Sequence, residues 1–181
     1  MKKRIYIFII CYWAFTVGLA GCKRNNPTPY RGLPKSYETA YQQIYGHCYD
    51  SLPDVAVVSL DLYSEGLELD ANKRIKGTGY NLYLSDIFVP DSLLEPGSYR
   101  SDTTGKAFTF LPGREFEGYP FGMYLLNIEN DKVLHIQLLD SGSFVYRNDS
   151  LAFTLYFRNT YGSKTTYTCS FSGTIQPWQK Q

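Results

Sequence analysis

The feature that most constrains the fold is the alternation of apolar and polar residues in short segments bounded by turn residues. In residues 54–63, for example, Val58, Leu60 and Leu62 are separated by Ser59 and Asp61. A period of two residues is that of a strand with one buried face. Gly, Pro, Asn, Asp and Ser fill the gaps between such segments, as expected for turns. The pattern predicts strands at 54–63, 79–85, 98–100, 106–111, 121–129, 132–140, 144–147, 151–159 and 165–175.

The segments between these strands carry no helical pattern of the length that parallel βαβ units need. The prediction is therefore an all-β fold, an antiparallel β-sandwich of about nine short strands, with a small β-barrel as the alternative. A content of 17 Tyr and 11 Phe against 2 Met agrees with β structure. Asn130-Asp131, between two predicted strands, is expected to form a tight hairpin turn.

The segment 37–49 fits either a helix or a strand. Tyr37, Tyr41, Tyr45 and Tyr49 recur every fourth residue, which fits both a helical stripe and one face of a strand. The second half of the segment favours a strand. A row of tyrosines could serve as a sugar-stacking platform, but a row at the edge of the core with its hydroxyls in solvent is the favoured interpretation.

The N-terminus carries an export signal. Lys2, Lys3 and Arg4 precede 13 uncharged, mostly apolar residues (5–17), which is shorter than the roughly 20 residues of a membrane span. The run ends at Leu19-Ala20-Gly21-Cys22, which resembles a bacterial lipobox. The resemblance implies a signal peptide over 1–21 and lipidation of Cys22, whereas a plain secretory signal or an uncleaved anchor would leave Cys22 incidental.

Residues 22–36 are expected to form a flexible, Pro-rich tether, because three prolines and a glycine exclude a helix or a central strand. A single β domain is expected over 37–181. Some Bacteroidetes lipoproteins carry an acidic run after the lipidated cysteine that directs them to the cell surface. Here Lys23 and Arg24 occupy that place. This favours an outer membrane lipoprotein that faces the periplasm over one that faces outward.

The charge balance excludes one class of partner. Loss of residues 1–21 leaves 15 basic and 17 acidic residues, a formal net charge of −2. Nucleic-acid-binding proteins carry a basic surface. No nucleic acid partner is expected.

After processing, Cys48 and Cys169 remain as the only internal cysteine pair. In an oxidising periplasm they could form a disulfide that closes a long loop. Two separate buried thiols are the equal alternative, because the sequence does not give the Cα separation.

The search for catalytic chemistry predicts no enzyme, no cofactor and no metal site. The two histidines, His47 and His135, lack ligand spacing, and no nucleophile elbow or phosphate loop is present. His47–Cys48 could be part of a thiol nucleophile, but neighbours on a strand point to opposite faces. A loose cluster of oxygen-bearing residues is better read as a solvated loop than as a Ca²⁺ site; its members are Asp61, Glu65, Glu68, Asp70 and Asn72.

One short motif recurs at predicted turns. Asp-Ser-Leu occurs three times and Asp-Thr-Thr once. These resemble the motif for general O-glycosylation of exported Bacteroidetes proteins, and the resemblance places sugars on Ser51, Ser92, Thr103 and Ser150. Asp-Ser is also ordinary turn chemistry.

The chain as a whole resembles a group of small Bacteroidetes lipoproteins of unknown function. The resemblance covers about 45–175 and is clearest at Leu94–Arg100 (LEPGSYR), where a Pro-Gly turn leads into a strand. It implies an all-β, membrane-anchored envelope protein, and it carries over no catalytic residue.

Three functions follow as hypotheses. The first is a non-catalytic envelope protein that binds a glycan, a peptide or another envelope protein. The second is an adhesin or fimbria-related subunit, which would assemble by strand exchange. The third is a small barrel with an apolar ligand, or a hydrolase with scattered carboxylates.

Overall fold

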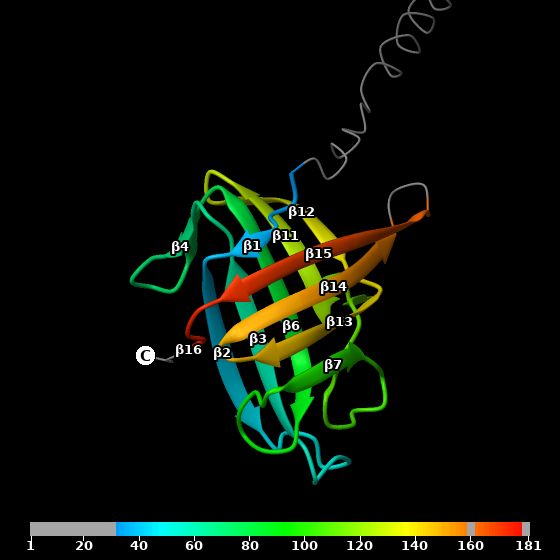
Figure 1. Ribbon diagram of the computed structural model, residues 1–181. Coiled ribbons are helices and arrows are strands. Elements are labelled where there is room, and N and C mark those ends of the chain that lie inside the picture. Colours follow the sequence, from blue (N-terminus) through cyan, green and yellow to red (C-terminus); the bar gives the residue numbers. More distant parts are fainter. Residues whose placement is uncertain (1–31, 159–161, 179–181) are drawn as a thin grey trace, which may run out of the picture. The chain divides into compact units, whose positions relative to one another are not determined.

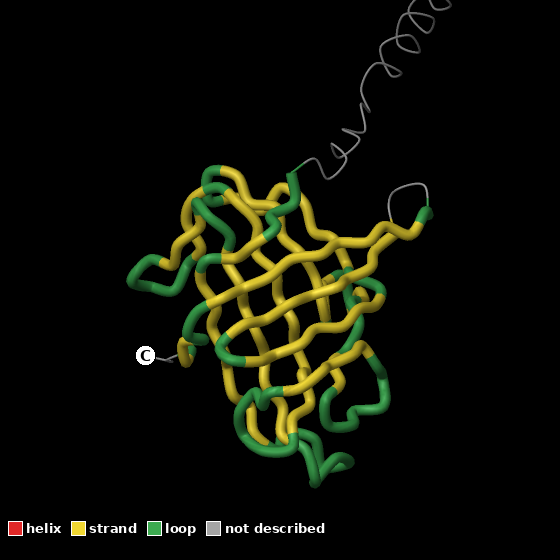
Figure 2. Tube along the Cα trace, in the orientation of Figure 1, coloured by secondary structure: helices red, strands yellow, loops and turns green. Residues whose placement is uncertain are grey.

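The computed structural model describes residues 32–158 and 162–178. They belong to one compact unit, Gly32–Gln181, and none of them is helical (Figure 2). The predicted all-β fold is confirmed. The predicted signal peptide, Cys22 and most of the predicted tether lie outside the described residues. Within the described ranges, no helical segment has the length and apolar character that a membrane crossing requires.

The unit contains sixteen strands (Figure 1). The first eight are β1 (Ser36–Tyr37), β2 (Thr39–Gly46), β3 (Ala56–Tyr63), β4 (Leu67–Leu69), β5 (Ile75–Gly77), β6 (Gly79–Val89), β7 (Gly97–Ser101) and β8 (Thr109–Phe110). The others are β9 (Arg114–Phe116), β10 (Tyr119–Phe121), β11 (Met123–Glu129), β12 (Lys132–Leu138), β13 (Ser141–Arg147), β14 (Ser150–Arg158), β15 (Lys164–Ser172) and β16 (Gln176–Pro177).

Twelve strands form one mixed sheet, rather than the predicted antiparallel sandwich of about nine. Its order is β1-β15-β14-β13-β7-β8-β6-β3-β2-β16, with β11 joined to β6 and β12 joined to β11. Three of its pairs are parallel, namely β1–β15, β7–β8 and β16–β2. Hairpins β4–β5 and β9–β10 form two small separate sheets. Alternation alone specifies strands and their faces, and does not specify which strands pair.

The large sheet curls back on itself. Strands β1 and β2 are separated only by Glu38, whose backbone N–H donates to Tyr63 O at 2.9 Å. Strand β1 pairs with β15 near one end of the sheet order, and β2 pairs with β3 near the other. Strand β1, at one end of the order, and β2, next to the other end, therefore lie on one short stretch of chain. In Figure 1, β13, β14 and β15 cross in front of β3 and β6.

All nine predicted segments contain a strand of the structure. The ambiguous segment 37–49 is also extended, as β1 and β2, which confirms the strand reading of its second half. The strands that the pattern missed are β4, β5, β9, β10 and β16, each of two or three residues. Such short strands do not complete enough alternations to show a period.

The predicted hairpin turn at Asn130-Asp131 is confirmed. Glu129 pairs with Lys132, and the two residues between them have φ values of 50° and 67°. Positive φ at both central residues is characteristic of the type I′ turn, which Asn and Asp tolerate. Asn148-Asp149 joins β13 to β14 in the same way, with φ values of 48° and 56°.

The core inside the curled sheet is built around stacked aromatic rings. Phe144 on β13 lies opposite Tyr99 on β7 and opposite Phe153 on β14. The Phe144 ring stacks on Tyr99, with centroids 4.5 Å apart and planes at 5°, and Phe110 lies 5.4 Å away. The Tyr99 hydroxyl donates to Glu95 O at 2.9 Å, so this buried phenol is satisfied.

The folded unit includes the end of the predicted tether. Ser36 pairs with Ser170, and the Ser170 N–H donates to Lys35 O at 3.0 Å. The Tyr167 hydroxyl donates to Pro34 O at 2.7 Å and also contacts the Tyr37 hydroxyl at 2.9 Å. The ordered fold thus starts before the predicted boundary at Tyr37.

Candidate functional site

The outer face of the β3–β6–β11 layer carries tyrosines. Asp61 on β3, Tyr83 on β6 and Tyr124 on β11 lie in register across the three strands. Their neighbours in each strand, such as Leu82 and Leu84, are fully buried and face the core. Because side chains alternate along a strand, Tyr83 and Tyr124 are on the opposite, outer face. Their ring centroids are 5.0 Å apart.

A pocket of about 450 Å³ lies over this face. Its volume is within the range of small-molecule sites. The residues that line it come from β2 and the turn after it, from β3, β6 and β11, and from the β9–β10 hairpin: Tyr45, Cys48, Tyr49, Val57, Tyr83, Ser85, Asp86, Pro120, Phe121 and Tyr124.

A bulge in β6 places a carboxylate in the pocket wall. Val58 pairs with Ile87 and Leu60 pairs with Leu84, so Ser59 alone lies opposite both Ser85 and Asp86. Asp86 has a φ of 49°, in the left-handed region that Asp tolerates better than most residues. An extra residue in one strand re-aims its side chains, and such bulges are common beside functional sites. Here Ser85 and Asp86 both line the pocket.

The Asp86 carboxylate is held by two hydroxyl groups. The Tyr49 hydroxyl donates to Asp86 Oδ1 at 2.5 Å, and the Ser85 hydroxyl donates to Oδ2 at 2.8 Å. Ser85 Oγ in turn accepts the Gly122 N–H at 3.1 Å. Asp86 is only 8% exposed, and none of the ion pairs among the described residues includes it. The site therefore has a nearly buried, oriented carboxylate that forms no salt bridge within the described part of the chain.

The β9–β10 hairpin forms another wall. It contributes Pro120 and Phe121 to the pocket. The Arg114 guanidinium lies over the Phe121 ring, with its Cζ 4.9 Å from the ring centroid. The hairpin is joined to β6 through Gly122, which donates to Ser85 Oγ and accepts the Ser85 N–H at 3.0 Å. The same short contacts hold this wall and the bulge together.

The four tyrosines of the row lie in three different surroundings: the interior, a cluster of aromatic rings and the pocket. Tyr37 is 3% exposed and bonded to Tyr167. Tyr41 packs edge-on against Tyr63 and Trp178, with centroids 5.8 and 5.6 Å apart. Tyr45 and Tyr49 line the pocket. Glu38 interrupts the alternation between β1 and β2, and a bulge lies near Gly46, so one face does not carry the whole row.

Three phenols of the pocket, those of Tyr49, Tyr83 and Tyr124, stay neutral at physiological pH. Burial raises the pKa of Tyr124 to about 12, and the charge of Asp61 adds to the effect. Burial also raises the pKa of Tyr83, with Tyr45 contributing, and the pKa of Tyr49, with Asp86 contributing. Uncharged hydroxyl groups can both donate and accept hydrogen bonds. The pocket thus combines neutral phenol rings with one carboxylate.

A second carboxylate lies on the same face, next to the pocket. Asp61 accepts hydrogen bonds from the Tyr63 hydroxyl, at 2.6 Å, and from the Asn81 side-chain amide. Burial raises the pKa of the Asp61 carboxyl above its ordinary value of 3.8, although these two hydrogen bonds oppose the shift. The Asp61 carboxyl therefore holds its proton more tightly in the folded protein than in the unfolded chain.

This shift predicts a pH dependence that Asp61→Asn removes. As the pH rises from 3.8 through the raised pKa, the folded wild-type protein releases a proton that the unfolded chain has already lost, so its free energy of unfolding falls. The free energy of unfolding of the wild type, measured relative to that of Asp61→Asn, should fall between pH 3.8 and the raised pKa. Above the raised pKa, this difference should stay constant. Urea unfolding of both proteins at a series of pH values measures the difference, and a difference that is constant with pH would refute the assignment.

The two described cysteines are free thiols, as in the predicted alternative of two separate buried thiols, except that Cys48 is not buried. Cys48 is exposed after the end of β2, and Cys169 is buried on β15. Strand β15, which carries Cys169, pairs with β1 at Tyr37. The eight residues of β2 lie between Tyr37 and Cys48 and span roughly 25 Å. That separation is far beyond the Cα distance that a disulfide allows.

The two thiols should differ strongly in reactivity. Burial raises the pKa of Cys169 to about 12, which suppresses the thiolate that alkylating reagents attack. Iodoacetamide at neutral pH is expected to modify Cys48 in the folded protein and Cys169 only after unfolding, as read by peptide mass mapping. Equal modification of both residues without denaturant would contradict the placement of Cys169.

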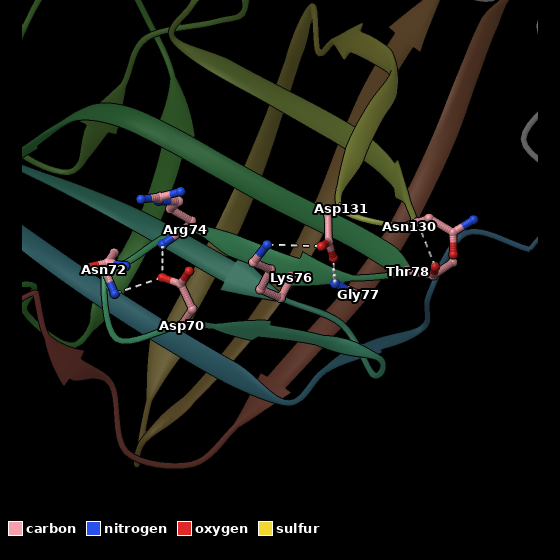
Figure 3. Close-up of polar contacts among 8 residues, drawn as sticks. All are labelled: Asp70, Asn72, Arg74, Lys76, Gly77, Thr78, Asn130 and Asp131. Atoms are coloured by element: carbon pink, nitrogen blue, oxygen red, sulfur yellow. Dashed lines mark hydrogen bonds and ion pairs between the residues drawn. The ribbon is translucent and has the colours of Figure 1, made fainter.

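The predicted acidic cluster serves turn structure (Figure 3). Asp70 Oδ1 accepts the backbone N–H groups of Asn72 and Arg74 at 2.8 and 2.9 Å, which closes the β4–β5 hairpin. Asp131 binds the Lys76 ammonium at 3.0 Å and the Gly77 N–H at 2.6 Å. Asp70 thus stabilises its own turn, whereas Asp131, which is not part of the predicted cluster, connects the β11–β12 turn to β5. Asp61 lies apart from them on β3, and Glu65 and Glu68 are exposed.

The remaining candidates do not converge. His47 is exposed in the turn after β2, and His135 is on β12. No group of three or more potential metal ligands occurs in residues 32–158 and 162–178. Of the predicted glycosylation positions, Ser51, Ser92 and Thr103 are exposed outside the strands. Ser150 is the first residue of β14 and contacts Ser172 Oγ at 3.3 Å.

Sequence reasoning did not identify Asp86, Ser85, Tyr83, Tyr124 or Phe121 as site residues. The sequence places Tyr83 only within the strand predicted at 79–85. Comparison of the chain with protein-family models, with curated proteins and with solved structures finds no match. Function is therefore inferred from the geometry of the pocket and from the sequence of the N-terminus.

Proposed function

We propose that the chain is a membrane-anchored cell-envelope lipoprotein whose β domain binds a ligand in the pocket over β3, β6 and β11, without catalysing a reaction. The observation that carries the binding proposal is the convergence of Tyr45, Tyr49, Tyr83 and Tyr124 around Asp86. Aromatic walls with a few oriented polar groups are characteristic of binding sites. A glycan, a peptide or another envelope protein could supply the bound group.

The interior of the sheet is a less suitable place for a ligand. Phe144, Tyr99 and Phe110 fill its centre with stacked rings. This favours the outer pocket over an apolar ligand held inside the fold. The pairing of both ends of the sheet order with the stretch Ser36–Gly46 supports the small-barrel alternative over a two-sheet sandwich.

Membrane attachment is proposed from the resemblance of Leu19–Cys22 to a lipobox. Cys22→Ser should abolish labelling by a radioactive fatty acid and release the protein from the membrane fraction. Cys48→Ser is the matched control and should leave both unchanged. A Cys22→Ser protein that is still labelled and still membrane-bound would refute lipid anchoring.

Orientation is tested with protease on intact cells, with lysed cells as the control. We propose an outer membrane anchor with the domain facing the periplasm. The domain should then survive in intact cells and disappear after lysis. Digestion in intact cells would place it on the surface instead.

Pocket binding is tested through the exposed thiol of Cys48, which lines the pocket. The rate of iodoacetamide modification at Cys48 is measured on the full chain in detergent, with probes of four kinds: organic ammonium ions, neutral sugars, apolar alcohols and carboxylates. At least one kind should slow the reaction at saturable concentration, and Tyr124→Leu should weaken that protection. If no probe protects Cys48, the pocket is not a binding site.

A second candidate is an adhesin or fimbria-related subunit, and one observation favours it. Among the described strands, β12 pairs with β11 alone, and its Val133, Leu134 and Ile136 are 51%, 58% and 42% exposed. An apolar edge strand can pair with another chain. A protein that stays monomeric at high concentration would count against assembly through this edge.

A further inference from the structure

We infer that the pocket recognises a positively charged organic group, an ammonium or guanidinium ion. The inference rests on the proposed function, because it specifies the ligand of that same pocket. The cation could belong to a small amine or to a basic side chain of a peptide.

The first argument is the charge of Asp86. Asp86 is only 8% exposed in the pocket wall, and no described cation forms an ion pair with it. A buried charge without a partner of opposite sign is costly. A carboxylate offers about four acceptor positions, and the hydroxyl groups of Tyr49 and Ser85 use two of them. The remaining positions can accept the N–H donors of a primary ammonium or guanidinium ion, or the hydroxyl group of a cation such as choline.

The second argument is the surroundings of that charge. Tyr45, Tyr49, Tyr83 and Tyr124 all line the pocket, and the Tyr83 and Tyr124 rings are tilted against each other at 32°. Ring faces attract ammonium and guanidinium ions, and this attraction strengthens when the ion is desolvated. The chain itself places the Arg114 guanidinium on the Phe121 ring at the same pocket. A cation is therefore favoured both by the carboxylate and by the rings.

The third argument is that the carboxylate is placed there by a special backbone conformation. In a regular strand, Asp86 would point to the opposite side from Ser85, into the core beside Leu84 and Ile87. The bulge and the positive φ of Asp86 bring both polar side chains to the pocket. Strained conformations of this kind are characteristic of functional positions.

The test is calorimetric titration of the full chain in detergent with two matched pairs of probes. Choline is compared with its neutral isostere 3,3-dimethylbutan-1-ol, and N-acetylated, C-amidated Gly-Lys-Gly with its norleucine counterpart. Each charged probe should bind at least about tenfold more tightly than its neutral partner, and added salt should weaken it. Tighter binding of the tripeptide than of choline would assign the cation to a peptide, and the reverse would assign it to a small amine.

Variants separate the role of charge from that of shape. Asp86→Asn keeps the side-chain shape and a residue that tolerates positive φ, and it should weaken both charged probes about tenfold or more while leaving the neutral ones unchanged. Asp91→Asn, in an exposed turn outside the pocket, is the control and should change nothing. Tyr124→Leu should weaken the charged probes roughly two- to fivefold, and Tyr124→Phe should not.

Substitution of Arg114 should have the opposite effect on binding of the charged probes. Removing its positive charge by Arg114→Gln should strengthen binding of choline, since two like charges no longer share the pocket. If the pocket instead selects anions, the same change should weaken its ligand.

The failures of the two proposals are distinguishable. If neutral and charged probes bind equally, or if Asp86→Asn has no effect on choline, the cation inference is overturned. If a neutral sugar such as N-acetylglucosamine nevertheless protects Cys48, the binding function stands without it. If no probe of any kind binds or protects Cys48, both proposals are overturned.

Discussion

Phe144→Ala is expected to lower the free energy of unfolding by about 3–5 kcal/mol, the range for removing a buried aromatic side chain. Phe144 is 1% exposed and contacts the rings of Tyr99, Phe110 and Phe153, with centroids 4.5, 5.4 and 5.3 Å away. The change would leave a cavity where strands β7, β8, β13 and β14 meet. The loss of stability exceeds the free energy of transferring one side chain from water, because the neighbouring rings also lose their contacts with Phe144.

Phe116→Ala is the matched control for this prediction. Phe116 is the same residue type on the short strand β9, and it is 62% exposed. Its removal should change the free energy of unfolding by no more than about 0.5 kcal/mol. Chemical denaturation of both variants gives the comparison, and similar values for the two would mean that Phe144 is not at the centre of the core.

Gly122→Ala is expected to destabilise the protein by about 3 kcal/mol and to disrupt ligand binding at the same time. Gly122 has a φ of 77°, and a Cβ there would lie 2.1 Å from the carbonyl oxygen of Pro112. The backbone would have to move, because the obstructing atom is not a flexible side chain. The movement would break the contacts of Gly122 with Ser85, which hold the bulge and the β9–β10 wall together.

Gly118→Ala separates the clash from the backbone strain. Gly118 lies in the turn of the same hairpin with a φ of 82°, and a Cβ there would meet no atom within 4 Å. Its substitution should cost only about 1–2 kcal/mol, the penalty for a left-handed residue, and leave the pocket unchanged. Denaturation curves and Cys48 protection are measured on both variants, and equal effects would refute the role given to the Pro112 contact.

Much of the strand content was predictable because the longer strands have one buried face. In β14, Leu151, Phe153, Leu155 and Phe157 are buried and alternate with more exposed residues. The Asn130-Asp131 turn was predictable for a different reason, since its residue types match the positive φ that a type I′ turn needs. Both signals are local, and both hold in the structure.

The pairing of strands was not predictable, because it depends on contacts that are distant in the sequence. Ser36 pairs with Ser170, and Gln176 pairs with Tyr41, both in parallel, and these pairs determine how the sheet curls. Consecutive strands pair along β13, β14 and β15, whereas β3 pairs with β6 and β6 pairs with β11, which are distant in the sequence.

The site was harder to predict than the fold. Asp86 reaches the pocket through a bulge, and regular alternation would have placed it with the core-facing residues. Tyr124 joins Tyr83 through strand register and not through sequence spacing. The tyrosine row did contain a signal, since Tyr45 and Tyr49 line the pocket, although Tyr37 belongs to the interior.

The central claim is that the outer aromatic pocket is where this protein binds its ligand. The most direct test is a crystal structure of the protein with the tightest of the probes that protect Cys48. The account predicts that the probe lies between Asp86 and the rings of Tyr83 and Tyr124, with the bulge in β6 retained. A probe bound elsewhere, with the pocket empty or closed, would contradict it.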